Sequence, residues 1–264
     1  MLLTELVASL RIDGNAHVLD DVPQDWTQGR TLFGGLQAAL LVHAMRSRVE
    51  PGLPLRTLQT TFVGPVFAGR LVIRCSVLRV GKSAVHVEGR ILDGDQVLCT
   101  ALAVFGRARE STLVITPPHP VVPLDAEHSK PMPWAGDAPP KFTQHVEQRW
   151  ASGAFPFCGG AEPRTQIYVR YKNEPEVDES LVIAMADTIP SPAISMLHSF
   201  APASSLSWTL ELLSDHWPRS GSDFWLVDAE ATAARDGYAF QTATMWSADG
   251  QAIALSRQSA VVFG

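Results

Sequence analysis

The sequence predicts an α+β fold in which two antiparallel sheets each wrap a central helix. Three observations lead to this prediction. Each half of the chain holds one segment that is apolar nearly all round, several strand-like runs with turn signals follow each segment, and a proline-rich stretch lies between the halves. A helix that is apolar on every side must be covered, and a curved sheet wrapped around it is an efficient way to bury it.

The first apolar segment is TLFGGLQAALLVHAM, residues 31–45, in whose second part only Gln37 and His43 are polar. This pattern predicts a buried helix, with His43 as a hydrogen-bonded core histidine. The counterpart in the second half is SLVIAMADTIPSPAISML, residues 180–197. Here we predict a second buried helix that breaks after Asp187, because two prolines follow that residue.

The strand-like runs repeat between the halves. The stretches GKSAVHVEGRILDG, residues 81–94, and GYAFQTATMWSADG, residues 237–250, have the same length and both end in Asp-Gly, a strong hairpin-turn signal. Each stretch is flanked by strand-like runs, and the last run of each half finishes in Val-Phe-Gly. The matching order favours an internal duplication. We therefore predict a double hotdog, in which each unit is one helix wrapped by a meander of antiparallel strands.

The predicted units are an N-terminal hotdog over residues 1–110 and a C-terminal hotdog over residues 143–264, which carries the catalytic residues. Residues 111–142 form the predicted linker. Proline lacks a backbone N–H, so this stretch is unsuited to a central strand or a helix interior and should lie extended on the surface. Its prolines are Pro117, Pro118, Pro120, Pro123, Pro131, Pro133, Pro139 and Pro140.

Composition and motifs exclude several classes of protein. The chain has 264 residues, is 46% hydrophobic and has a formal net charge of −6, which permits a substantial core and argues against bulk nucleic-acid binding. No apolar run is long enough to span a membrane. The N-terminus predicts a short amphipathic helix and lacks the basic start of a secretion signal. The chain contains no serine-hydrolase elbow, dinucleotide fingerprint or phosphate-binding loop.

The cysteines Cys75, Cys99 and Cys158 are an odd and widely spaced set. Such a set indicates a reducing cytoplasm and argues against a disulfide framework or a zinc site. We therefore predict a cytoplasmic protein without a membrane span, and we expect neither a metal nor another cofactor.

Three stretches carry a resemblance to a known family: FGGLQAAL in the first predicted helix, LQTTFVGPVFAG entering the first strands, and ADGQAIALSRQSAV near the C-terminus. In these stretches the chain resembles the acyl-CoA thioesterases of type II, which are double-hotdog enzymes. The resemblance implies that Asp187, a hydroxyl residue and Gln258 position a water molecule. It assigns the hydroxyl to Ser205, with Ser204 and Ser207 as neighbouring alternatives.

The chemistry of thioester hydrolysis agrees with these residue types. The reaction needs a water, a group that accepts its proton, and donors for the negative charge that develops on the carbonyl oxygen. An apolar site raises the pKa of an acid such as Asp187 and makes it a better base, while Gln258 can donate and accept hydrogen bonds. Gly34 and Gly35 begin the first predicted helix, whose backbone N–H groups are ready donors for a substrate.

Each candidate also has a structural interpretation. Asp187 is also typical of a helix end or turn, Gln258 of a solvent-facing strand position, and Ser205 of a strand start. The pair Gly34–Gly35 also permits close packing of a helix against a sheet. The family resemblance favours the functional interpretation of Asp187.

We therefore predict an enzyme that hydrolyses acyl-CoA thioesters to free fatty acid and CoA. One alternative is a hotdog-fold acyl-thioester hydratase or dehydratase, which would need a histidine beside the carboxylate, and His198 lies beyond two prolines from Asp187. The other alternative is a non-catalytic acyl-CoA binding protein. Acyl-CoA is the predicted partner, nucleic acid is not, and exposed sheet edges are compatible with a homo-oligomer.

Overall fold

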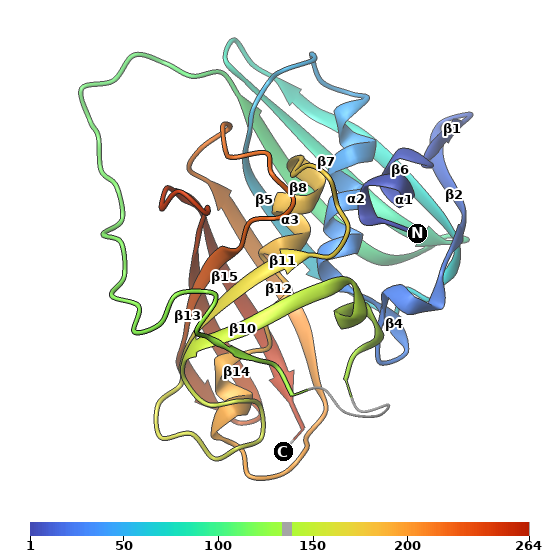
Figure 1. Cartoon of the computed structure of the whole chain (residues 1–264). Helices are drawn as coiled ribbons and strands as arrows, with labels where there is room; N and C mark the ends of the chain where they lie inside the picture. Colours follow the sequence, from blue (N-terminus) through green and yellow to red (C-terminus); the bar gives the residue numbers. More distant parts are fainter. Residues whose placement is uncertain (134–138, 264) are drawn as a thin grey trace.

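The computed structural model describes residues 1–133 and 139–263, and within these residues no helix is both long and apolar enough to cross a membrane. Figure 1 shows helices enclosed by a strongly curved sheet, which confirms the predicted α+β class. The helices are α1 (Leu3–Ala8), α2 (Gly34–Arg46) and α3 (Glu179–Met185), and short 3-10 turns form η1 (Gln24–Trp26), η2 (Lys141–His145) and η3 (Pro192–Met196).

Among the described residues, thirteen strands form one continuous antiparallel sheet, and a separate small hairpin holds two more. The N-terminal half of the sheet has the order β1 (Arg11–Asp13), β2 (Ala16–Val22), β6 (Gly69–Val80), β7 (Ala84–Asp93), β8 (Gln96–Gly106) and β5 (Leu55–Phe62). The C-terminal half continues with β12 (Ala203–Leu212), β15 (Ala252–Val262), β14 (Tyr238–Trp246), β13 (Trp225–Arg235), β11 (Arg164–Tyr171), β10 (Val146–Ser152) and β9 (Lys130–Pro131). The small hairpin consists of β3 (Thr27–Gln28) and β4 (Thr31–Leu32).

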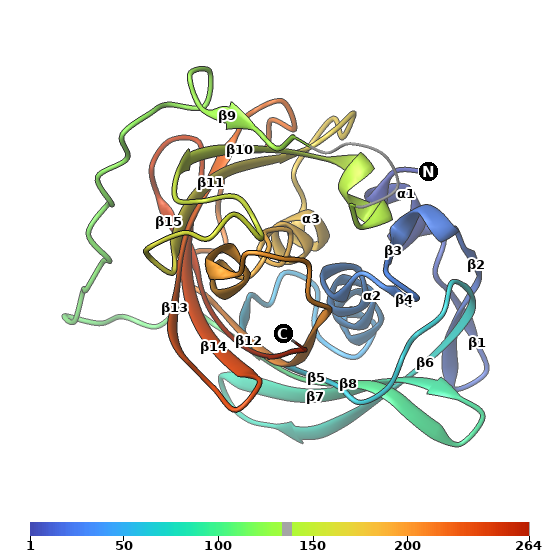
Figure 2. The ribbon, with the colours of Figure 1, turned by 90° about the horizontal axis from the view of Figure 1, so that it is seen from below.

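The two predicted sheets join edge to edge. β5 of the first half pairs with β12 of the second, with Thr60 opposite Trp208 and Gln59 opposite Thr209. Figure 2 shows the joined sheet curving around both α2 and α3. This pairing satisfies the backbone groups of two strands that would otherwise be open edges.

The two central helices run antiparallel. At the start of α2, a methyl group built on Gly35 would lie 2.8 Å from the carbonyl oxygen of Ala184 at the end of α3. At the opposite end, Arg46 Nε donates to Glu179 Oε2 at 2.7 Å, and the guanidinium group stacks over Phe105. Two junctions therefore connect the helices, and at each the start of one helix meets the end of the other.

The second helix is shorter than the sequence pattern suggests. α3 ends at Met185, and the backbone N–H groups of Asp187 and Thr188 bond back three residues, as in a tight 3-10 turn. The Thr188 hydroxyl also donates to the Met185 carbonyl at 2.8 Å. The two prolines then exclude a continued helix, and Pro192 begins η3. Asp187 is therefore held by a turn and not by helix packing.

The predicted linker has two parts that differ in the structure. Residues 107–125 are mostly exposed and arch away from the body in Figure 1, and the apolar side chains of Leu113, Val114 and Ile115 are at least 74% exposed. Further on, β9 pairs with β10 at the edge of the sheet, and Phe142 stacks on Phe33. Residues 134–138 lie outside the described residues, and the exact linker bounds stay a prediction.

We expect limited proteolysis to cut between residues 108 and 142 before it cuts any strand. The exposed first part of this segment has few backbone hydrogen bonds to lose, so a protease can bind it in an extended form. Intact-mass measurement of the first products should give two fragments that correspond to the two halves. Early cleavage within residues 81–94 or 237–250, which form hairpins here, would contradict the two-unit organisation.

Candidate active site

Asp187 lies at the junction between the end of α3 and the start of α2. The residue is partly accessible to solvent. Burial of the carboxyl group raises the pKa of Asp187 to about 7, and hydrogen bonds from the Gln258 side chain and the Gly35 backbone N–H oppose this rise. An acid with such a pKa exists in both protonation states near neutral pH, so it can accept a proton and release it again.

Gln258 connects the predicted site residues. Its Nε2 donates to Asp187 Oδ1 at 2.8 Å and to Ser205 Oγ at 3.0 Å. Its Oε1 accepts a hydrogen bond from Nε2 of Gln241 at 2.7 Å. Both N–H groups of Gln258 are therefore in use, and the side chain acts on a water chiefly through the carboxylate and the hydroxyl that it holds.

A bulge in β12 selects Ser205 among the three neighbouring serines. Trp208 pairs with Gln258 and Ser207 with Ser259, but Ser205 pairs with Ala260, so one extra residue is inserted between Ser205 and Ser207. Because side chains alternate along a strand, this insertion turns Ser205 to the face of the sheet that carries Gln258. Ser205 is half-buried there, whereas Ser204 and Ser207 are exposed.

Gly34 and Gly35 form the first turn of α2 beside the carboxylate. A methyl group built on Gly34 would lie 2.7 Å from Asp187 Oδ2 and 3.0 Å from the ring of Phe62. The first turn of a helix also leaves backbone N–H groups without intrahelical acceptors. The junction therefore combines a carboxylate, a hydroxyl and first-turn backbone N–H groups, of which that of Gly35 bonds to Asp187. Together these groups can orient a water and stabilise an oxyanion.

Two histidines considered from the sequence lie away from this network. His43 is near the far end of α2 and is exposed, so the prediction of a core histidine is wrong. Partial desolvation by its neighbours lowers its pKa, and the charges of Asp178 and Glu179 oppose the shift. His198 is exposed and lies against Gly159. Within the described residues, the side-chain hydrogen bonds of Asp187 involve neither histidine.

Sequence reasoning missed Gln241 and Tyr171. Gln241 lies on β14 directly opposite Gln258, and its side chain is 8% exposed. Tyr171 lies on β11, and its pKa is raised well above its ordinary value, first by burial and then by the charge of Asp187. One signal for Gln241 was available: it shares the inward face of its strand with Ala239, where a long polar side chain is unusual.

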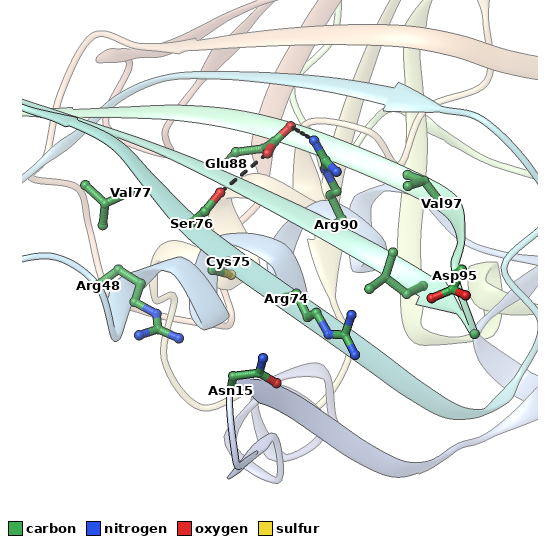
Figure 3. A pocket seen from close by; sticks show the side chains of 12 residues that line it. Asn15, Arg48, Arg74, Cys75, Ser76, Val77, Glu88, Arg90, Asp95 and Val97 are labelled. Carbon is green, nitrogen blue, oxygen red and sulfur yellow. Dashed lines mark hydrogen bonds and ion pairs between the residues drawn. The ribbon is translucent and has the colours of Figure 1, made fainter.

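Two surface cavities lie away from this network. One, of about 450 Å³, is lined on the N-terminal half by Arg48, Arg74 and Arg90 among others, and Figure 3 shows Glu88 bonded to Arg90 there. Another, of about 560 Å³, lies over the outer face of β12–β15 and includes Arg257. No predicted site residue lines either cavity. The candidate site is thus defined here by its hydrogen-bond network.

Comparison with family models gives a match to each half. Residues 22–106 match the model described as acyl-CoA thioesterase N-terminal domain, and residues 126–262 match the acyl-CoA thioesterase C-terminal domain. A search of curated proteins found no match.

Solved structures similar to this chain share its fold over nearly their whole length. A conserved protein of unknown function with a hot dog fold from Alicyclobacillus acidocaldarius has 24% identity and a TM-score of 0.88, covering 100% of this chain and 99% of that one. A putative thioesterase II from Thermobifida fusca has 16% identity and a TM-score of 0.82, covering 99% and 97%. The tesB protein of Mycobacterium avium subspecies paratuberculosis has 17% identity and a TM-score of 0.79, covering 100% of both chains. At these identities the likeness shows the fold alone, which is the predicted double hotdog.

Proposed function

Since the chain belongs to the acyl-CoA thioesterase family, which both of its halves match, we propose that it hydrolyses acyl-CoA thioesters to free fatty acid and CoA with an activated water. One observation carries the proposal above all. The carboxyl group of Asp187, whose pKa burial raises to about 7, is held at the start of α2 by Gln258, which also holds Ser205.

In the proposed reaction, ionised Asp187 accepts a proton from the water as its oxygen attacks the thioester carbonyl carbon. Ser205 accepts a hydrogen bond from Gln258, so its own O–H is free to donate to the water or the substrate. Backbone N–H groups in the first turn of α2 stabilise the oxyanion. The C–S bond then breaks, CoA leaves as a thiolate, and the proton held by Asp187 returns to the leaving sulfur or to solvent.

The cytoplasm remains the proposed location. Within the described residues, Cys75, Cys99 and Cys158 are all free thiols. Burial raises the pKa of Cys75 to about 11 and that of Cys99 to about 12, so both stay protonated near neutral pH. Free, protonated thiols are compatible with a reducing compartment.

A free-thiol assay with a panel of acyl-CoA esters tests the proposal. We expect thiol release whose kcat/KM rises with pH through about 7, because deprotonated Asp187 is the active form. A hydratase would change the acyl chain without releasing thiol, and a binding protein would bind acyl-CoA without either reaction. Either of these results would replace the proposal.

We expect alanine at Gly34 and at Gly35 to have different effects. The new methyl group at Gly34 would meet Asp187 Oδ2 at 2.7 Å and displace the carboxylate, so kcat should fall by about 10-fold or more. At Gly35 it would meet the ring of Phe33 at 2.5 Å and the backbone oxygen of Ala184 at 2.8 Å, which would displace the ring and push the helices apart at a cost of about 1–3 kcal/mol in stability.

Steady-state kinetics and thermal melting of both variants check this pair, and each variant is the matched control of the other. An intact kcat in Gly34→Ala would show that the carboxylate is not held against this glycine during turnover. An unchanged melting temperature in Gly35→Ala would show that the helices tolerate a wider separation.

A further inference from the structure

Gln241 contacts the site but has no place in the reaction described above. It lies directly opposite Gln258 in the β14–β15 register, it is buried, and its Nε2 donates to Gln258 Oε1 at 2.7 Å. Its own Oε1 is buried and has no hydrogen-bond partner in the part of the chain that the structure describes. Among the described residues, the side chain of Gln241 thus forms its hydrogen bond with Gln258.

Stability alone does not account for a glutamine at this position. A buried carbonyl oxygen without a partner lowers stability, because its lost hydration is not replaced. An apolar side chain of similar length would avoid that loss and suit the inward face of β14, where Ala239 and Met245 are also buried. Among the described residues, the bond to Gln258 is the hydrogen bond that this amide makes, so its effect on the site acts through that bond.

That bond decides which end of the Gln258 amide faces the carboxylate. The two ends of an amide group have nearly the same shape but opposite hydrogen-bonding character. With Oε1 of Gln258 accepting from Gln241, the NH₂ group faces Asp187 and Ser205. With Gln241 in its present orientation, reversal of the Gln258 amide would bring two NH₂ groups together and turn a carbonyl oxygen toward the carboxylate of Asp187.

We propose that Gln241 is a positioning residue, which fixes the Gln258 amide with its donors toward Asp187 and Ser205. The inference rests on the proposed function for its catalytic consequence, but its structural part can be measured without turnover. Gln241 touches neither the substrate nor the reacting atoms and acts through Gln258 alone.

The orientation of this amide also controls the acidity of the site. A donated hydrogen bond from Gln258 favours ionised Asp187 and lowers its pKa against the effect of burial. A reversed amide would accept a hydrogen bond from the protonated acid and raise the pKa. Among the described residues, Tyr171 is the titratable group coupled to Asp187, and its own raised pKa keeps it neutral in this range.

The test is a ¹³C-carboxyl NMR titration of Asp187, assigned with Asp187→Asn, in the wild type and in Gln241→Met. We expect the Asp187 pKa to rise by about one unit in the variant. We expect kcat/KM to fall by about 10-fold near neutral pH and its acid limb to move up by the same amount. Gln241→Leu, which removes the donor without adding a charge, should shift the pKa in the same direction if Gln241→Met does not fold.

Gln166→Met is the matched control. Gln166 is as buried as Gln241 and makes two side-chain hydrogen bonds, to Ser152 and Val121, but neither involves the site. It should lower the melting temperature and leave the Asp187 pKa unchanged.

In a Gln258→Ala background, Gln241→Met should no longer change the pKa of Asp187. A folded Gln241→Met or Gln241→Leu protein with an unchanged Asp187 pKa would overturn the inference. Absence of thiol release from the wild type would instead overturn the proposed function and leave the titration valid.

Discussion

Replacement of Asp187 by asparagine is expected to lower kcat on the order of 10²–10⁴-fold, because an amide cannot accept the proton of the attacking water. The substitution keeps the size of the side chain and one oxygen that can accept the hydrogen bond from Gln258. The loss should therefore appear in kcat with little change in the fold. The measurement is kcat for the best acyl-CoA ester in the panel, with circular dichroism on the same preparation.

The stability of this variant has a pH dependence with a definite sign. The pKa of Asp187 is raised from 3.8 to about 7 in the folded protein. The folded state thus holds the proton to higher pH than the unfolded chain, so the wild type loses stability from this group as pH rises from about 4 to about 7. The asparagine variant has no such loss.

Melting temperatures of the wild type and of Asp187→Asn at several pH values check this predicted pH dependence. Relative to the wild type, Asp187→Asn should become more stable as pH rises from 5 to 8. Near-wild-type turnover together with an unchanged melting profile would remove Asp187 from the site. A variant that is inactive because it unfolds would show a lower melting temperature across the whole range.

The second large effect is expected at Gln258, whose loss should not add to that of Asp187. Gln258→Ala removes the donor that holds both Asp187 and Ser205, so we expect kcat to fall on the order of 10²-fold. If the two side chains serve one water, either substitution alone already disables it. The double variant should then be little worse than Asp187→Asn.

The three variants form a double-mutant cycle that is read in log kcat on one substrate. Gln166→Met serves again as the control, since its effect should be fully additive with that of Asp187→Asn. Additive losses for Gln258→Ala as well would mean that Gln258 serves the substrate or the fold independently. The residues that act on the water would then be Asp187 and the backbone donors at the start of α2.

The elements that follow from a local pattern could be predicted from the sequence. The apolar run with two glycines at its start predicts α2, and the Asp-Gly turns predict the β7–β8 and β14–β15 hairpins that the structure contains. Asp187 and Gln258 could be named as candidates because the family resemblance covers their surroundings. Their contact, across seventy-one positions, depends on the register of β15 and on the end of α3.

Features that depend on strand pairing could not be predicted. The bulge that turns Ser205 inward is a mismatch between two strands, and a single strand carries no sign of it. The joining of β5 to β12 is likewise a choice between partners with similar edges. Gln241 was missed because a polar residue in an alternating strand is ordinarily assigned to the solvent face.

The two junctions between the antiparallel helices hold different residues in this chain. At one, the start of α2 meets Asp187; at the other, the start of α3 carries Glu179, which the ion pair with Arg46 occupies. Two identical subunits related by a twofold axis would have to place the same residues at both positions. Fusion into one polypeptide removes that constraint, so one junction can keep a reactive acid while the other becomes a clamp. The expected stoichiometry is then one thioester bound per chain, although the architecture repeats twice.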